Sequence, residues 1–202
     1  MYIYLYDKDE IESSEDAVRE CSRDYAEKTR MGLPSHIIES AHIFHSPAGK
    51  PAFIDLPEIH FSVSHSGSVW GCAIDNTPVG FDLEDMNRPE SEKGQDSKCA
   101  SEERWQKIAG RFFTPEEFEF VCKGGREAFF QLWVRKEAYV KYKGLKLLQE
   151  LPKINLVKDG ELLSELSDAY TEEINLGRGL IGAYCGAKRK NIRKIMDYRN
   201  NK

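Results

Sequence analysis

Short stretches in the first half of the chain alternate hydrophobic and polar residues. They cover 2–6, 61–65, 69–75 and 79–84. Because successive side chains of a β-strand point to opposite faces of its sheet, this alternation predicts strands with one buried face. Between 46 and 60 the pattern is interrupted by prolines and glycines, so we expect a loop there.

Helical patterns occupy much of the remaining chain. We expect helices over 14–31, 35–41, 101–111 and 127–143, and the last of these is clearly amphipathic. The segment Thr114-Pro-Glu-Glu places a capping hydroxyl, a proline and two acids in the order that favours the first turn of a helix.

Strand patterns return near the end of the sequence. The segments 154–158, 160–163, 172–176 and 180–187 predict a meander. The tail from Lys188 is basic, and we expect it to fray.

One long polar segment separates the two halves of this pattern. Residues 85–101 are rich in Asn, Pro, Ser, Gly, Gln and charged residues. Such a composition cannot bury enough apolar surface to offset the entropy of ordering, so we expect a mobile loop.

The composition is that of an ordinary globular protein, with 40% hydrophobic and 31% charged residues among 202. A net charge of −5 argues against nucleic-acid binding through a basic surface. The longest apolar runs are too short to span a membrane, and the first residues are typical of a strand, not of a signal peptide. We therefore expect a cytoplasmic protein.

The cysteines indicate no special chemistry. There are five, an odd number, and no Cys-x-x-Cys pair occurs, so neither a disulfide framework nor a zinc site is predicted. Cys72 and Cys185 lie in small apolar runs, and we expect them to be buried, inert thiols.

Three carboxylates gather in two short stretches. Asp82 and Glu84 lie in Val-Gly-Phe-Asp-Leu-Glu, where alternation places both on one face of a strand. Glu137 lies in a helical pattern, in line with Trp133 and Lys141 at spacings of four residues. A hard cation such as Mg²⁺ is the simplest reason for such a cluster. The alternatives are a solvated strand face for the first two acids and an ion pair between Glu137 and Lys141.

The segment Ser64-His-Ser-Gly ends a predicted strand in a tight turn. Its hydroxyl, imidazole and free N–H groups suit a phosphate, and the alternative is that His65 is a hydrogen-bonded turn residue. Ser64 and His65 are neighbours that point to opposite faces of a strand, so they make a poor nucleophile–base pair. Lys50 and Lys28, taken one by one, are best explained as solvated lysines.

Five segments, taken in order, resemble the Sfp-type 4′-phosphopantetheinyl transferases. The resemblance covers roughly residues 20–185, and five motifs in the family's order, with the third acid on the right helix, are specific. The segments are Gly49-Lys-Pro, Phe61-Ser-Val-Ser-His-Ser-Gly, Val79-Gly-Phe-Asp-Leu-Glu, Arg111-Phe-Phe-Thr-Pro-Glu-Glu and Trp133-Val-Arg-Lys-Glu-Ala-Tyr-Val-Lys.

The resemblance implies an α+β fold of two pseudo-symmetric subdomains, with the active site in the cleft between them. We place the subdomains at 1–75 and 76–202. The similar segments Trp70-Gly-Cys-Ala-Ile and Ile181-Gly-Ala-Tyr-Cys are compatible with two equivalent halves, and chance similarity explains them equally well.

It also implies an activity. A monomer of this family transfers 4′-phosphopantetheine from coenzyme A to a serine of an apo acyl or peptidyl carrier protein, with Mg²⁺, and releases adenosine 3′,5′-bisphosphate. Neither a nucleic acid nor a membrane is an implied partner.

The resemblance further implies roles for named residues. Asp82, Glu84 and Glu137 would hold Mg²⁺ on the pyrophosphate of coenzyme A. Glu137 is also the candidate base for the incoming serine, a role we rank second to metal ligation, and Lys141 would contact phosphate. Asp82, Glu137 and Lys141 thus form the expected catalytic set. The expected coenzyme A contacts are Lys28, Lys50, Pro51, Ser64 and His65.

Two other functions remain open. A Mg²⁺-dependent nucleotide phosphohydrolase would use the same acids but would release phosphate or nucleotide without a carrier protein. A coenzyme A or carrier-protein binding module without turnover is the non-enzymatic alternative, and the acids and Lys141 argue against it.

Overall fold

The computed structural model describes residues 1–87 and 100–198. The strands are β1 (Tyr2–Asp7), β2 (Ile43–His45), β3 (Pro51–Phe53), β4 (His60–Ser66), β5 (Val69–Asp75), β6 (Val79–Asp85), β7 (Val157–Lys158), β8 (Glu161–Leu162), β9 (Tyr170–Gly177), β10 (Leu180–Gly186) and β11 (Lys194–Asp197). The helices are α1 (Ser14–Thr29), α2 (Ser35–Ser40), α3 (Ala100–Phe112), α4 (Pro115–Lys143) and α5 (Leu147–Glu150), with short 3₁₀ turns at Lys8–Glu10 and Leu151–Lys153.

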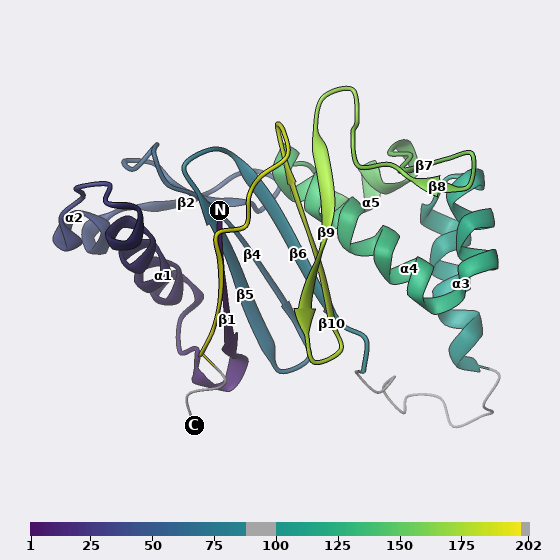
Figure 1. The fold of residues 1–202 in the computed structure, drawn as a ribbon, viewed down its shortest axis with the longest axis horizontal. Coiled ribbons are helices and arrows are strands. Elements are labelled where there is room, and N and C mark those ends of the chain that lie inside the picture. The colour runs from purple at the N-terminus through teal and green to yellow at the C-terminus, as the bar shows by residue number, and fades with distance from the viewer. Residues whose placement is uncertain (88–99, 199–202) are drawn as a thin grey trace.

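Two sheets form the centre of the molecule. One has the strand order β11-β1-β5-β4 and the other β6-β10-β9. They pack on each other through an apolar cluster that includes Leu5, Phe81 and Leu83. Helix α1 covers the first sheet on one side of the molecule, and α4 with α3 lies beyond the second sheet on the other side (Figure 1). Because Phe81 and Leu83 face the first sheet, alternation turns Asp82 and Glu84 together to the opposite face, as predicted, and α4 packs on that face.

Serine side chains join the two sheets at their adjacent edge strands, β4 and β6. Ser62 Oγ accepts the N–H of Phe81 at 2.9 Å, and Ser64 Oγ donates to Asp82 Oδ1 at 2.6 Å. Ser66, two residues further on the same face of β4, also bonds to β6. The acid-bearing strand is therefore held in place by hydroxyl groups of the neighbouring sheet.

Helix α4 begins where the sequence predicts. Thr114 Oγ1 accepts the N–H of Glu117 at 3.3 Å, and a Glu117 carboxylate oxygen accepts the N–H of Thr114 at 2.9 Å, which completes a capping box. The helix is interrupted at Gly125 (φ 69°, ψ −150°) and ends at Gly144 in the left-handed conformation. The stretch between these glycines carries Glu137 across β6 and β10.

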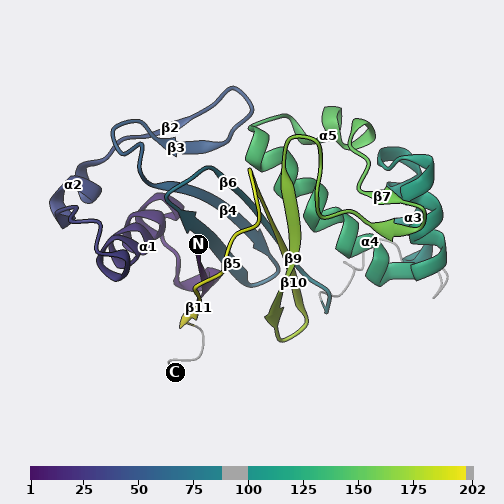
Figure 2. The same ribbon diagram turned by 45° about the horizontal axis from the view of Figure 1, so that its top comes forward.

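Three expectations about the path of the chain are wrong. The segment 46–60 contains β3, which pairs with β2 in a hairpin that extends toward the end of α4 (Figure 2). Strands β7 and β8 form their own hairpin instead of joining a four-stranded meander. The tail after Lys188 returns as β11, parallel to β1, because Ile195 and Met196 pack against the two apolar clusters on either face of β1.

The other expectations about the fold have mixed outcomes. The α+β class is confirmed, whereas pseudo-symmetry and a division after residue 75 stay predictions; β11 joins the sheet of the first half. Residues 88–99 of the expected loop lie outside the described residues. Cys72 and Cys185 are buried free thiols, as predicted. None of the helices in the described part of the chain is long and apolar enough to cross a membrane.

Candidate active site

A cavity of about 240 Å³ lies where the β2–β3 hairpin meets the end of α4. Two of its walls are polar, formed by Lys50 with Ser62 on one side and by Glu137 with Lys141 on the other. The remaining walls are apolar or main chain. They come from Ala48, Gly49, Pro51, Val63, Val140, Gly144, Leu145 and Leu147.

Asp82 does not line this cavity, but it contacts Lys141, which does, and it is only 2% exposed. Ser64 Oγ and Lys141 Nζ both donate to its Oδ1, each at 2.6 Å. Its other oxygen, Oδ2, is buried and has no hydrogen-bond partner among the described residues. Since a buried carboxylate oxygen without a partner is costly, this atom is suited to an added donor or cation.

Glu137 faces Asp82 from α4. Its carboxylate lies 3.8 Å from Lys141 Nζ, so the ion pair considered from the sequence is present but long. Burial, and then the negative charge of Asp82, raise the pKa of Glu137 to about 8. One ammonium therefore serves two acids, and the pair is short of positive charge.

Glu84 is the third acid, and its carboxylate accepts a hydrogen bond from Ser66. Burial raises the pKa of Glu84 above its ordinary value, while hydrogen bonds from Ser66 and from the Trp133 side chain act in the opposite direction. Desolvation alone would lower the pKa of Lys141, but the acids around it, Asp82 first, raise it above its ordinary value. Lys141 is thus a cation held in place by acids.

The predicted metal set can be tested against these contacts. Among the described residues, no group of three or more His, Cys, Asp and Glu side chains is arranged to hold a metal ion as it stands. The bare Oδ2 of Asp82 and the raised pKa values of Glu84 and Glu137 nevertheless fit an added hard cation, because carboxylate oxygens are the ligands that Mg²⁺ prefers. A shared site remains a prediction.

The expected coenzyme A contacts separate into groups. Lys50 and Pro51 line the cavity, as the resemblance implies for a ligand pocket. Ser64 does not line it, because its hydroxyl is buried against Asp82. His65 is exposed on β4, where alternation turns it away from its neighbour, and it does not line the cavity either.

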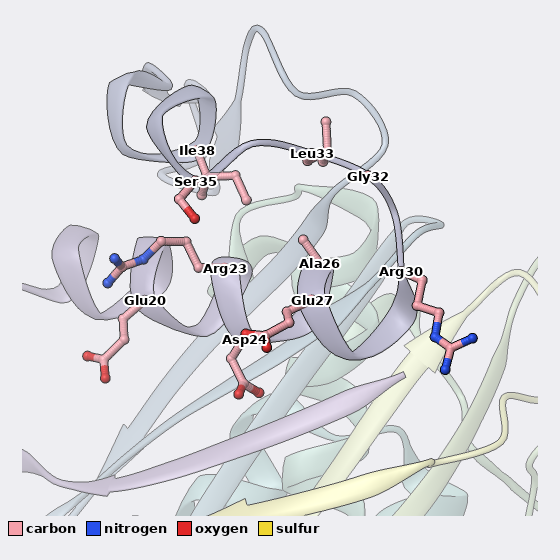
Figure 3. A pocket seen from close by; sticks show the side chains of 10 residues that line it. All are labelled: Glu20, Arg23, Asp24, Ala26, Glu27, Arg30, Gly32, Leu33, Ser35 and Ile38. Carbon is pink, nitrogen blue, oxygen red and sulfur yellow. The ribbon is translucent and has the colours of Figure 1, made fainter.

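Lys28 lies apart from this cavity, on α1, and pairs with Asp24. Asp24 lines a different cavity, of about 490 Å³, between α1 and α2. Figure 3 shows charged side chains of both signs around it, among them Glu20, Arg23 and Arg30. Three acids and two arginines line it, so this hollow has no excess of positive charge that would attract a phosphate.

Sequence reasoning missed three residues that orient the acids. Ser62 and Ser66 bond to β6, and the Trp133 side chain bonds to Glu84. The available signal was the serine alternation over 62–66, which places three hydroxyls on one face of β4. Read only as a phosphate cradle, that pattern hid its role in supporting Asp82.

Comparisons with known proteins match the segment of the chain that carries these acids. A family model described as the 4′-phosphopantetheinyl transferase superfamily matches residues 78–185, more than half of the chain. The chain belongs to the 4′-phosphopantetheinyl transferase superfamily. The matched segment of this superfamily includes Asp82, Glu84, Glu137 and Lys141, and the Sfp-type resemblance is thereby confirmed.

Curated relatives in the superfamily share about a third of their aligned residues with this chain. The 4′-phosphopantetheinyl transferase Sfp of Bacillus subtilis (strain 168) is 35% identical over 149 residues, 69% of this chain and 60% of the relative. The 4′-phosphopantetheinyl transferase psf-1 of Bacillus pumilus is 30% identical over 159 residues, 71% and 62%. The HetI transferase of Nostoc sp. is 34% identical over 89 residues, 42% and 32%. The chain thus spans about three fifths or less of the length of these relatives.

Proposed function

We propose that this chain transfers the 4′-phosphopantetheine group of coenzyme A to a serine of an apo acyl or peptidyl carrier protein and releases adenosine 3′,5′-bisphosphate. The main support is the buried, bare oxygen of Asp82 beside Glu137, at a cavity that Lys141 also lines. Acids short of positive charge complement a divalent cation, and the lysine complements a phosphate.

Asp82, Glu84 and Glu137 would hold the Mg²⁺ of this reaction. When bound, the ion would neutralise negative charge on the reacting phosphorus and on the leaving group. The chain's own residues position the acids: Ser64 and Lys141 fix Oδ1 of Asp82 and so leave Oδ2 facing away from them. Lys141 would also stabilise negative charge on the pyrophosphate.

Glu137 is the candidate that takes the proton of the attacking serine, directly or through water. A pKa raised to about 8 suits a general base at neutral pH, whereas metal ligation would lower it, so we rank the ligand role first. The serine oxygen would bond to the phosphorus of the phosphopantetheine group, and the phosphoanhydride bond to adenosine bisphosphate would break.

Of the residues expected to contact the rest of coenzyme A, only two line the cavity. Lys50 and Pro51 line the cavity and are proposed to meet the nucleotide. Roles for Lys28 and His65 stay predictions that rest on the resemblance. A monomeric state is proposed on the same basis, and a cytoplasmic location is proposed on the sequence features given above.

A labelling assay tests the proposal directly. The protein is incubated with fluorescent coenzyme A, Mg²⁺ and an apo carrier protein, and the carrier is analysed by mass spectrometry for the added phosphopantetheine mass. Asp82→Asn is expected to lower the rate of labelling by about two orders of magnitude or more, because it removes a charge that acts on the reacting phosphate. The folded state is expected to persist.

The matched control is Asp168→Asn, since Asp168 pairs with Lys143 outside the cavity. It should label the carrier at the wild-type rate. Full labelling by Asp82→Asn would remove the metal assignment. Release of nucleotide without a labelled carrier would favour the phosphohydrolase, and coenzyme A binding without either product would favour the binding module.

A further inference from the structure

The side chain of Lys50 crosses from the β2–β3 hairpin into the other half of the molecule. Its Nζ donates to the carbonyl of Val79 at 3.2 Å and to the carbonyl of Tyr142 at 3.3 Å. Val79 begins β6, the strand with Asp82, and Tyr142 lies in the last turn of α4, the helix with Glu137. One ammonium therefore contacts both elements that carry the acids.

The carbonyl of Tyr142 is one of those that a helix leaves without an internal partner at its C-terminal end. The N–H groups of Gly144 and Leu145 turn back to the carbonyls of Lys141 and Val140, so those two are used. Lys50 fills the same role for Tyr142 from outside the helix. A cation at this end also interacts favourably with the helix dipole.

The main chain at Lys50 is itself fixed by hydrogen bonds, so both ends of this side chain are held in place. The N–H of Lys50 donates to Ser46 Oγ at 3.1 Å, and its carbonyl accepts the N–H of Ser46 at 2.9 Å. Gly49, at φ 88°, closes this small loop with a bond to the Ser46 carbonyl at 2.7 Å.

The contact that Lys50 bridges is unusually close. A Cβ at Gly80 would lie 2.0 Å from the carbonyl oxygen of Ala138 and 2.4 Å from the nitrogen of Tyr142. The backbone of β6 thus lies directly on the backbone of α4, next to the two carbonyls that Lys50 holds. Burial lowers the pKa of Lys50 to about 8, as expected for an ammonium removed from water and held mainly by neutral acceptors.

We propose that Lys50 is a positioning residue, which clamps the end of α4 on the start of β6 and so sets how Glu137 and Lys141 lie against Asp82. It acts through these residues and is not itself a catalytic group. The kinetic part of this inference rests on the proposed transferase function. It differs from the expectation that Lys50 only contacts coenzyme A, because the two hydrogen bonds of its ammonium go to main-chain carbonyls of the protein.

The test compares Lys50→Met, Lys50→Arg and Lys143→Met with the wild type. Methionine keeps most of the apolar stem and removes the donor, and arginine restores donors. Lys143 is the matched control, because its Nζ also donates to a carbonyl near the end of α4, that of Asp168 at 3.4 Å, but makes no bridge to the hairpin. The readouts are kcat and KM for coenzyme A, and hydrogen–deuterium exchange of the last turn of α4.

We expect Lys50→Met to lower kcat roughly tenfold while KM changes less than about threefold, because the reacting groups are displaced after binding. Exchange at the end of α4 should accelerate, Lys50→Arg should recover much of kcat, and Lys143→Met should change neither kinetic constant. If Lys50→Met unfolds, Lys50→Gln, which is shorter than lysine and carries no charge, replaces it with the same expectations.

Two results would overturn the inference. A raised KM with unchanged kcat and exchange would make Lys50 a coenzyme A contact, and unchanged values throughout would leave it without a role. If the wild type transfers nothing, the proposed function fails, yet the exchange experiment still decides whether Lys50 clamps α4.

Discussion

Two lysines on α4, five positions apart, meet acids in opposite ways. Lys136 and its partner Glu117 are both 0% exposed, and the Lys136 ammonium also donates to the carbonyl of Ile154 at 2.7 Å. The Glu117 carboxylate accepts two further main-chain bonds. Lys141 is shared between Asp82 and Glu137, and one oxygen of Asp82 is left bare.

The comparison separates a structural ion pair from a reactive one. A buried pair with every atom satisfied holds elements together, and nothing remains for a ligand to do. An acid pair with one cation and an unpartnered oxygen stores unfavourable charge, which a proton on Glu137 or an added cation can relieve. The two clusters differ less in how deeply they are buried than in whether each buried polar atom has a hydrogen-bond partner.

Breaking the satisfied pair should have the largest effect on stability. Lys136→Met leaves Glu117 buried and uncompensated, so the free energy of unfolding should fall by about 3–5 kcal/mol. Chemical denaturation measures the change. The control is Lys141→Met, which should destabilise less, because Glu137 can take up a proton in place of the lost cation. Equal losses in the two variants would contradict the distinction.

Relieving the unsatisfied pair should have a smaller effect of opposite sign. The pKa of Glu137 is raised from 4.5 to about 8 by folding, so the folded protein binds more protons between these pH values. Its contribution to stability is therefore complete below pH 4.5 and is lost as the pH rises through 8. The side chain of Glu137→Gln cannot ionise. The free energy of unfolding of this variant, relative to that of the wild type, should therefore be higher at pH 9 than at pH 5 by on the order of 3 kcal/mol.

This measurement is made by denaturation in EDTA, so that divalent ions are absent. Adding Mg²⁺ at high pH should stabilise the wild type and leave Glu137→Gln less affected, because ligand binding to the folded state raises its stability. A pH profile that is the same for both proteins would show that the acid pair is not strained.

The smallest expected effect concerns the support of the third acid. Ser66 donates to Glu84 and accepts the N–H of Asp85 at 3.1 Å. Ser66→Ala should lower the free energy of unfolding by about 1 kcal/mol, because the hydrogen bonds of Ser66 with Glu84 and Asp85 are removed. We also expect a several-fold loss of carrier labelling. Ser68→Ala, at an exposed turn position, is the control. Wild-type labelling by Ser66→Ala would show that Glu84 needs no support.

Patterns of neighbouring residues predicted many of the helices and strands, but they did not predict which distant segments pair as strands. Thr114 defines the start of α4 because a helix cap depends on a few adjacent residues. The strand 69–75 was predicted over its observed length because its neighbours on both sides are turns. In contrast, β3 and β11 are too short to show a pattern, and each forms only because another segment offers a strand beside it.

The candidate site shows the same division. Periodicity placed Asp82 and Glu84 on one face of a strand and Glu137 in line with Lys141 on a helix, because it fixes side-chain direction. That the two surfaces meet was implied only by the family resemblance. Periodicity could not show that Ser64 bonds to Asp82 or that Lys50 reaches two carbonyls, because both contacts depend on how separate elements lie in space. Ser64 and Lys50 were singled out as coenzyme A contacts, and only the structure shows their bonds within the protein.

The close approach at Gly80 has a practical consequence for anyone who maps this protein by random mutagenesis. No side chain fits between the strand and the helix there, since even a methyl group would overlap the Ala138 carbonyl. Substitutions of Gly80 should therefore inactivate the protein as often as substitutions of the acids, although glycine has no reactive side chain. An inactivating substitution at Gly80 indicates that β6 and α4 must lie close together. Interpreting it as the loss of a substrate contact would misdirect inhibitor design.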